Sequence, residues 1–207
     1  MQQLDHIVYA VPNLEESMNW FEAKAGIRPV FGGYHTNQGT KNALLKLGEQ
    51  CYLELLAVDE ENTAIAAPRW MGIDLITQPK ITRWAVRPAD LQKGSEVLKS
   101  YHAEMGNITG GQRKMTNGKL LTWELTMPLA EPEVEILPFL LNWERSESHP
   151  ADSLKDHCTL VKFQLIHPTP ESIQSVLKKL EINLPVVKGE SVNISLQMNT
   201  PKGILSL

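Results

Sequence analysis

The amino-acid sequence predicts an α+β fold made of repeated βαβββ modules, two of them complete and a third shortened. The first observation is a pattern that occurs three times, in which an apolar strand ends at a proline and an amphipathic helix follows. These prolines are Pro12, Pro88 and Pro168, roughly 80 residues apart. The second observation is that strand-like runs follow each helix before the next copy begins. A repeat this long is one unit of several strands plus one helix, and it is too long for a solenoid repeat.

The three helices are predicted from the spacing of their apolar residues. In the first copy Leu14, Met18 and Phe21 fall at i, i+4 and i+7, which forms one apolar stripe. Similar spacing predicts helices over residues 89–104 and 170–180, and a proline near the start of each helix supplies a suitable φ. Each helix therefore has one face to bury against the sheet of its own module.

Apolar runs bounded by turn residues predict the remaining strands. They are residues 27–31, 42–47 and 51–58 in the first copy, 112–115, 120–127 and 134–143 with a turn at 116–118 in the second, and 184–187, 192–198 and 204–207 in the third. The copies define three modules, residues 1–78, 79–150 and 157–207, the last packed in the same unit. Residues 59–78 are predicted to be a helical or looped connection, and residues 144–156 a polar linker.

Composition excludes several classes of function. The chain has 207 residues, of which 42% are hydrophobic, enough for one large core or two smaller ones. A net charge of −4 and no basic run argue against nucleic acid as a partner, and no apolar run is long enough to span a membrane. The first residues do not resemble a signal peptide. Cys51 and Cys158 are interpreted as reduced, buried thiols, so a cytoplasmic location is expected.

Two polar residues stand out on predicted strands. His6 shares one face of its strand with Val8 and Ala10, because side chains alternate along a strand. Glu54 is flanked by leucines on another strand, where an unpaired carboxylate is costly to bury. A metal ion, a cationic side chain or a wet cavity would each relieve that cost. A histidine alone in a strand is more often a hydrogen-bonded core residue than a ligand.

The repeated module and its opening residues resemble a known superfamily. The segment 4–14, LDHIVYAVPNL, is similar to the start of vicinal oxygen chelate proteins, which include glyoxalase I, extradiol dioxygenases and bleomycin-resistance proteins. The closer resemblance is to the glyoxalase-like domain of many bacterial proteins, through segments 32–45, 52–57 and 137–143 and the pair His149-Pro150. It covers residues 4–150 well and the remainder loosely. The resemblance implies the fold more strongly than the chemistry.

The resemblance also implies a metal site on the first and fourth strands of a module, at His6 and Glu54. A divalent ion such as Zn, Mn, Fe or Ni suits these ligands. The matching positions of the second copy hold Thr82 or Arg83, and neither is an ordinary ligand. Further carboxylate or amide groups there are Glu124, Glu135 and Asn142. Arg83 can instead neutralise Glu54 or bind a substrate carboxylate, which would make the site an anion pocket.

Other candidate binding residues are predicted from their surroundings. His35, Lys41 and Asn42 lie in or beside a glycine-rich stretch, where they either bind a ligand or only shape the turn. Trp84 and Trp143, together with Trp123, either line an aromatic pocket or fill the core. His149 and His167, each before a proline, are interpreted as turn residues. Hydrolase and dehydrogenase motifs are absent from the sequence.

Two main functions follow from these residues. The first is an enzyme that binds a small molecule and uses a metal for lyase, isomerase or dioxygenase chemistry. The second is a metal-free protein that binds or sequesters a small molecule in an aromatic cleft. A structural module with a vestigial cleft is a third alternative. The third copy either completes the fold within one chain or leaves an edge at which a homodimer forms.

Overall fold

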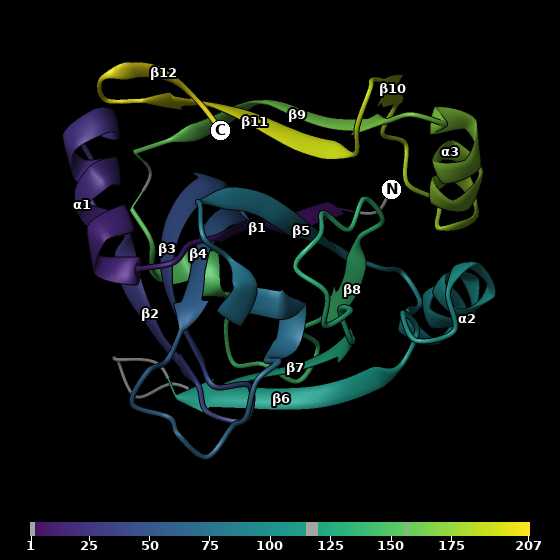
Figure 1. Cartoon of the computed structure of the whole chain (residues 1–207), viewed down its shortest axis with the longest axis horizontal. Coiled ribbons are helices and arrows are strands. Elements are labelled where there is room, and N and C mark those ends of the chain that lie inside the picture. The colour runs from purple at the N-terminus through teal and green to yellow at the C-terminus, as the bar shows by residue number, and fades with distance from the viewer. Residues whose placement is uncertain (1–2, 115–119, 156) are drawn as a thin grey trace.

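A computed structural model describes residues 3–114, 120–155 and 157–207 of the chain (Figure 1). The first module consists of β1 (Gln3–Ala10), α1 (Leu14–Ala25), β2 (Val30–His35), β3 (Thr40–Gly48) and β4 (Cys51–Val58). The second consists of β5 (Lys80–Arg87), α2 (Leu91–Tyr101), β6 (Ile108–Lys114), β7 (Leu120–Thr126) and β8 (Phe139–Asn142). The third consists of β9 (Thr159–His167), α3 (Pro170–Lys179), β10 (Val186–Lys188), β11 (Asn193–Thr200) and β12 (Gly203–Ser206). Two short 3-10 helices, η1 (Trp70–Leu75) and η2 (Pro150–Ser153), lie in the connections.

The first two modules form one curved sheet of eight strands in the order β2-β3-β4-β1-β5-β8-β7-β6. The two modules join where β1 pairs with β5 in antiparallel fashion, and in each module the first strand is parallel to the last. The third module forms a separate sheet, β10-β9-β11-β12. It therefore repeats the order of elements along the chain but not the order of strands in space. Figure 1 shows this second sheet across one side of the first, with α1 at one end and α2 and α3 at the other.

Local sequence explains where the first two helices begin and where α1 ends. The side chain of Asn13 accepts a hydrogen bond from the backbone of Glu16, and Asp90 does the same for Lys93, so both are N-caps. Helix α1 ends at Gly26, whose φ of 74° lies in the left-handed region that glycine adopts easily. Helix α2 is shorter than the predicted 89–104 at both ends, because it begins only after its cap Asp90 and ends at Tyr101, before His102 in an extended conformation.

The two faces of the eight-stranded sheet have different surroundings. On one face, Ile7 and Val11 of β1 join the main core with α1, α2, α3 and the second sheet. On the concave face, Val8 and Ala10 join a smaller cluster with η1, β7 and β8. The alternation predicted for β1 and β4 is therefore confirmed. His6 and Glu54 share the concave face, which holds the candidate site.

Several predictions from the sequence fail in detail. The strand predicted at 27–31 is found at Val30–His35, so the glycine-rich stretch begins inside β2. Only residues 139–142 of the predicted strand 134–143 are a strand, because Glu135 and Ile136 instead bond to Thr82 and to the Trp84 side chain. The predicted linker 144–156 contains η2 and buried residues, so much of it packs against the fold. The predicted turn at 116–118, Met115 and Asp156 lie outside the described residues. None of the helices in the described ranges has the length and apolar character needed to cross a membrane.

Candidate functional site

A small cavity of about 30 Å³ lies on the concave face of the eight-stranded sheet, and we call it the inner cavity. Its polar lining comes from the first module and its lining from the second module is apolar or aromatic. The lining residues are His6, His35, Asn42, Tyr52 and Glu54 from the first module, Trp123, Leu125, Phe139, Leu141 and Trp143 from the second, and Trp70 and Met71 from η1. The cavity therefore has a polar half and an apolar half, a composition that small-molecule sites share, although it is much smaller than the pockets of drug-sized ligands.

Strand pairing brings the polar groups together. β1 and β4 are parallel neighbours in a register that places His6 opposite Tyr52 and Val8 opposite Glu54. β3 is the antiparallel neighbour of β4 on the other side and places Asn42 opposite Leu56. Because these residues share one face of adjacent strands, their side chains meet above the same part of the sheet.

The carboxylate of Glu54 lies at the centre of the polar half. Its Oε2 is 3.4 Å from Nε2 of His6, and its Oε1 accepts a hydrogen bond of 2.6 Å from Nδ2 of Asn42. The same Oε1 is 3.9 Å from Nε2 of His35. His6, His35, Asn42 and Glu54 are all buried. Two imidazole rings and one amide therefore converge on a single buried carboxylate.

A second carboxylate, Asp5, orients His6 from behind. Its Oδ1 is 2.7 Å from Nδ1 of His6, and its Oδ2 is 3.0 Å from both Nε2 of His149 and Nε1 of Trp143. Nε of Arg87 is 3.4 Å from Oδ2. Burial raises the pKa of Asp5, but the hydrogen bonds from His149 and His6 outweigh it and hold that pKa well below its usual value. Asp5 is therefore an ionised, fully buried acceptor.

The hydrogen bonds fix the protons of these histidines. Because Asp5 is ionised, Nδ1 of His6 donates to it, and Nε2 of the same ring faces Oε2 of Glu54. Nδ1 of His149 accepts from the backbone of Ala151, so its Nε2 donates to Asp5. Nε2 of His6 and Oε2 of Glu54 therefore face each other 3.4 Å apart, in an orientation that lets them share a proton or a ligand group.

The segment η1 covers the cavity with Trp70 and Met71. Met71 is buried with a φ of 57°, a left-handed conformation that is strained for a non-glycine residue and is held by its packing. Nε1 of Trp70 donates to the hydroxyl of Thr40 at 3.3 Å, and Nδ1 of His35 lies 3.0 Å from the same oxygen. The cover is therefore connected to His35 through one hydroxyl group.

The structure brings only some of the predicted site residues together. His6, His35, Asn42, Glu54 and Trp143 line the inner cavity, whereas Lys41, Arg83 and Trp84 do not. Lys41 forms an ion pair with Glu60 at the surface. Trp84 packs in the main core and donates from Nε1 to the carbonyl of Ile136.

Arg83 does not pair with Glu54, contrary to the interpretation of the site as an anion pocket. Its Nε is 2.8 Å from Glu135, and its other nitrogens donate to the backbone carbonyls of Leu129, Glu131 and Glu133. Burial lowers the pKa of Arg83 and raises that of Glu135, and their mutual attraction opposes both shifts. Arg83 therefore anchors the segment before β8 and has no free face for a substrate carboxylate.

Sequence reasoning missed Asp5, His149 and Thr40 as parts of the site. Asp5 stands directly before His6, so a carboxylate beside a candidate histidine was an available signal. His149 was interpreted as a turn residue, and it is indeed the N-cap of η2. The contact of His149 with Asp5 joins the segment after β8 to β1. The two residues are far apart in the sequence, and no local pattern predicts such a contact.

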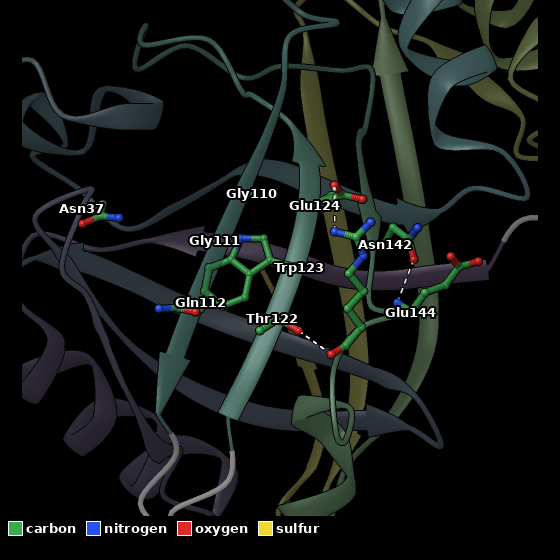
Figure 2. A pocket seen from close by; sticks show the side chains of 10 residues that line it. Asn37, Gly110, Gly111, Gln112, Thr122, Trp123, Glu124, Asn142 and Glu144 are labelled. Atoms are coloured by element: carbon green, nitrogen blue, oxygen red, sulfur yellow. Dashed lines mark hydrogen bonds and ion pairs between the residues drawn. The ribbon is translucent and has the colours of Figure 1, made fainter.

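A larger groove of about 550 Å³ lies beside β6 and β7 (Figure 2). Figure 2 shows Glu124, Asn142 and Glu144 together on one side of β7, while the Trp123 ring lies toward β6 beside Gly111. A Cβ atom at Gly111 would come within 2.5 Å of that ring, so the glycine makes room for it. Thr122 and Glu124 alternate with Trp123 along β7, so the groove and the inner cavity lie mainly on opposite faces of the sheet. The groove contains neither His6 nor Glu54.

The potential metal ligands among the described residues do not form a complete metal site. Nε2 of His6 lies 3.4 Å from the carboxylate of Glu54 and Nε2 of His35 lies 3.9 Å from it. Glu124, Glu135 and Asn142 do not line the inner cavity. Within the described ranges, no group of three or more His, Cys, Asp or Glu side chains is arranged to hold a metal. A catalytic zinc ion ordinarily has three protein ligands. The residues as arranged therefore do not fit the metal that the superfamily resemblance implies.

The paired βαβββ modules around one cavity are the fold that the resemblance to the glyoxalase-like domain implies. The chain belongs to the glyoxalase-like domain family, whose model matches residues 4–181. Comparison with curated proteins finds no match.

Comparison with solved structures finds similar proteins. A hypothetical protein from Staphylococcus aureus is 15% identical, with a TM-score of 0.65 over 93% of this chain and 88% of the other. A methylmalonyl-CoA epimerase from Mycobacterium tuberculosis is 22% identical, with a TM-score of 0.39 over 67% of this chain and 84% of the other. At 15% identity, the likeness to the Staphylococcus aureus protein concerns the fold alone.

Proposed function

We propose that the chain binds a small molecule in the inner cavity and that His6 and Glu54 transfer a proton to or from it. The observation that carries the proposal is the facing pair itself, Nε2 of His6 and Oε2 of Glu54, 3.4 Å apart in a buried cavity. A pair of titratable groups in a cavity is the arrangement that general acid–base catalysis uses.

The surrounding groups support separate roles for the pair. Asn42 donates to Oε1 of Glu54 and Asp5 accepts from Nδ1 of His6, so both reacting groups are held by a neighbour. Glu54 then acts as the base that removes a proton from a bound carbon or oxygen. His6 in its protonated form acts as the acid on the opposite side. The aromatic half excludes water, which strengthens these interactions.

A metal-assisted reaction is the second candidate, and one observation favours it. Histidines that bind metals almost always donate their other ring nitrogen to a carboxylate or carbonyl, as His6 does to Asp5. His6 and Glu54 would hold the ion, which would supply Lewis-acid polarisation of a substrate oxygen. The missing third ligand argues against this candidate, and the proton-transfer proposal needs no such ion.

Proton exchange in heavy water tests the proposal. The protein is incubated with small carbonyl compounds such as hydroxyacetone and butanone, and loss of the protons beside the carbonyl is followed by proton NMR. We expect exchange that falls about 100-fold in Glu54→Gln, because general-base catalysis contributes that much or more. Glu60→Gln, an exposed glutamate paired with Lys41, is the matched control and should exchange like the wild type.

The outcomes separate the candidates. Exchange that survives chelation supports proton transfer by the side chains, and exchange that requires added Zn, Mn, Fe or Ni supports the metal-assisted reaction. Binding without exchange supports the metal-free sequestering protein. Exchange that is equal in wild type and Glu54→Gln contradicts the proposal.

A further inference from the structure

The inner cavity is too small, as it stands, for a ligand of more than a few atoms. Its volume of about 30 Å³ has room for roughly one or two water molecules, whereas pockets for small-molecule ligands ordinarily measure roughly 300–1,000 Å³. Trp70 and Met71 of η1 form two of its walls. A larger ligand therefore enters only when part of the lining moves.

The segment η1 is attached to the fold differently from the other walls. Those walls come from β1, β2, β3, β4, β7 and β8, whose backbones are paired in the eight-stranded sheet. By contrast, the backbone–backbone hydrogen bonds that residues 64–79 form within the described part of the chain are all local, such as those from Gly72 to Arg69 and from Ile76 to Ile73. A segment without strand pairing opens at a lower cost in free energy than the sheet does.

The two ends of η1 are joined to each other. The backbone nitrogen of Arg69 donates to Oδ2 of Asp74 at 2.6 Å, and the guanidinium of Arg69 forms an ion pair with the same carboxylate. The flanking residues 66–68 and 77–79 are exposed. The segment is therefore a small closed unit between two exposed flanks, which can absorb changes in backbone angle while the unit keeps its shape.

A hydrogen bond from Trp70 and apolar packing hold η1 over the cavity. Nε1 of Trp70 donates to Oγ1 of Thr40 on β3 at 3.3 Å. Met71, Gly72 and Ile73 are buried, and Met71 keeps a left-handed φ of 57°, which is strained for a non-glycine residue. Release of η1 relieves this strain, so it offsets part of the packing that is lost.

We propose that η1 is a lid, which opens as a unit over the inner cavity while the sheet stays folded, and that the hydrogen bond between Trp70 and Thr40 is its latch. The inference concerns access to the cavity, so it goes beyond the proposed proton transfer and does not depend on it. In the closed position Trp70 and Met71 exclude water from the cavity. The latch hydroxyl also lies 3.0 Å from Nδ1 of His35, so the latch contacts the polar half of the cavity directly.

The reactivity of a thiol placed on the buried side of the lid measures its opening. Met71→Cys places a thiol in the closed cavity, and Ala57→Cys places one in the main core, where only unfolding exposes it. Both variants react with iodoacetamide, peptide mass spectrometry separates the introduced thiol from Cys51 and Cys158, and each rate is divided by that of the same thiol in urea-unfolded protein. We expect this ratio to be at least about 100-fold higher for Met71→Cys, because a local opening costs less than unfolding.

A second reporter and a latch variant complete the test. Ile73→Cys should give the same ratio as Met71→Cys if η1 moves as a unit, and it replaces that variant if Met71→Cys does not fold. Adding Trp70→Phe to either reporter keeps a ring but removes the donor, so the ratio should rise about fivefold, the net effect of one neutral hydrogen bond. Trp20→Phe is the matched control, because Trp20 is 40% exposed on α1 and does not line the cavity.

The inference is overturned if the ratio for Met71→Cys is no higher than that for Ala57→Cys, because η1 would then open only when the whole chain unfolds. Unequal ratios at positions 71 and 73 would show separate fraying and would also contradict a lid. A ratio that Trp70→Phe leaves unchanged removes the latch. Since no ligand is used, the lid and the proposed proton transfer fail separately.

Discussion

Nδ1 of His6 lies 2.7 Å from Oδ1 of Asp5, so the histidine that faces Glu54 is held from behind by a second buried carboxylate. The other oxygen of Asp5 accepts from Trp143 and His149, which belong to the segment after β8. One carboxylate therefore fixes the orientation of His6 and also ties the end of the second module to β1. This relationship underlies the first two predictions.

Replacing Asp5 by Asn should destabilise the fold. The oxygen of the introduced amide can accept a hydrogen bond but carries no charge. The amide nitrogen is a donor, and it would face the donor nitrogen of either His149 or His6. We expect a loss of about 2–4 kcal/mol in the free energy of unfolding, measured by urea denaturation, because charged buried hydrogen bonds are lost together. Asp90→Asn is the matched control, since Asn caps helices as well as Asp, and it should change the stability by less than about 0.5 kcal/mol.

The contribution of Asp5 should also depend on pH. The pKa of Asp5 in the folded protein is lowered below its usual value, because hydrogen bonds from His149 and His6 outweigh the effect of burial. A lowered folded-state pKa contributes stability that is complete above the unfolded value and is lost as the pH falls toward the folded value. The stability difference between wild type and Asp5→Asn should therefore be constant near neutral pH and shrink below about pH 4. A difference that stays constant down to about pH 3 would show that Asp5 is not the ionised acceptor.

Replacing Arg83 by Met should destabilise the protein strongly, because Glu135 would remain buried without its partner. Such losses are about 3–5 kcal/mol. The double variant Arg83→Met with Glu135→Leu should recover much of the loss in urea denaturation, since two apolar residues can pack in place of the pair. If the double variant is less stable than Arg83→Met, the ion pair is not the source of the effect.

Replacing Gly72 by Ala should disturb the cover of the inner cavity. Gly72 has a φ of 58°, and a Cβ atom there would lie 2.4 Å from the backbone nitrogen of Pro132. We expect a loss of about 1–3 kcal/mol in thermal or urea unfolding, together with weaker binding of any ligand that Trp70 and Met71 enclose. Gly48→Ala, whose nearest neighbour would be 3.6 Å away, is the control and should behave like the wild type in ligand binding.

Repetition and alternation predicted much of the fold. The prolines at 12, 88 and 168 mark three strand-to-helix junctions, and the strands of the first module were predicted in their observed order. Period-two alternation placed His6 and Glu54 on one face, and the parallel register of β1 and β4 then brings them together. These features depend on residues close in sequence or on repeated local patterns.

Local patterns in the sequence do not predict which distant residues a long side chain contacts. Arg83 stands at a position that resembles the ligand position of β1, yet its partners come from the 129–135 segment, which has no regular pattern of its own. Irregularities in the pairing of β1 with β5 also break the simple alignment of the two copies. The contacts of Asp5 with His149 and of Trp70 with Thr40 join distant segments, so they appear only once the chain is folded.

A crystal structure of the purified protein grown with hydroxyacetone, supported by elemental analysis of the same sample, tests the claim that the inner cavity binds a small molecule beside His6 and Glu54. We expect electron density for the ligand in the inner cavity, in contact with His6 or Glu54 and enclosed by Trp70, Trp123 and Trp143. We also expect that elemental analysis finds no stoichiometric metal. Ligand density confined to the groove beside β6 and β7, with only water between His6 and Glu54, would contradict the claim.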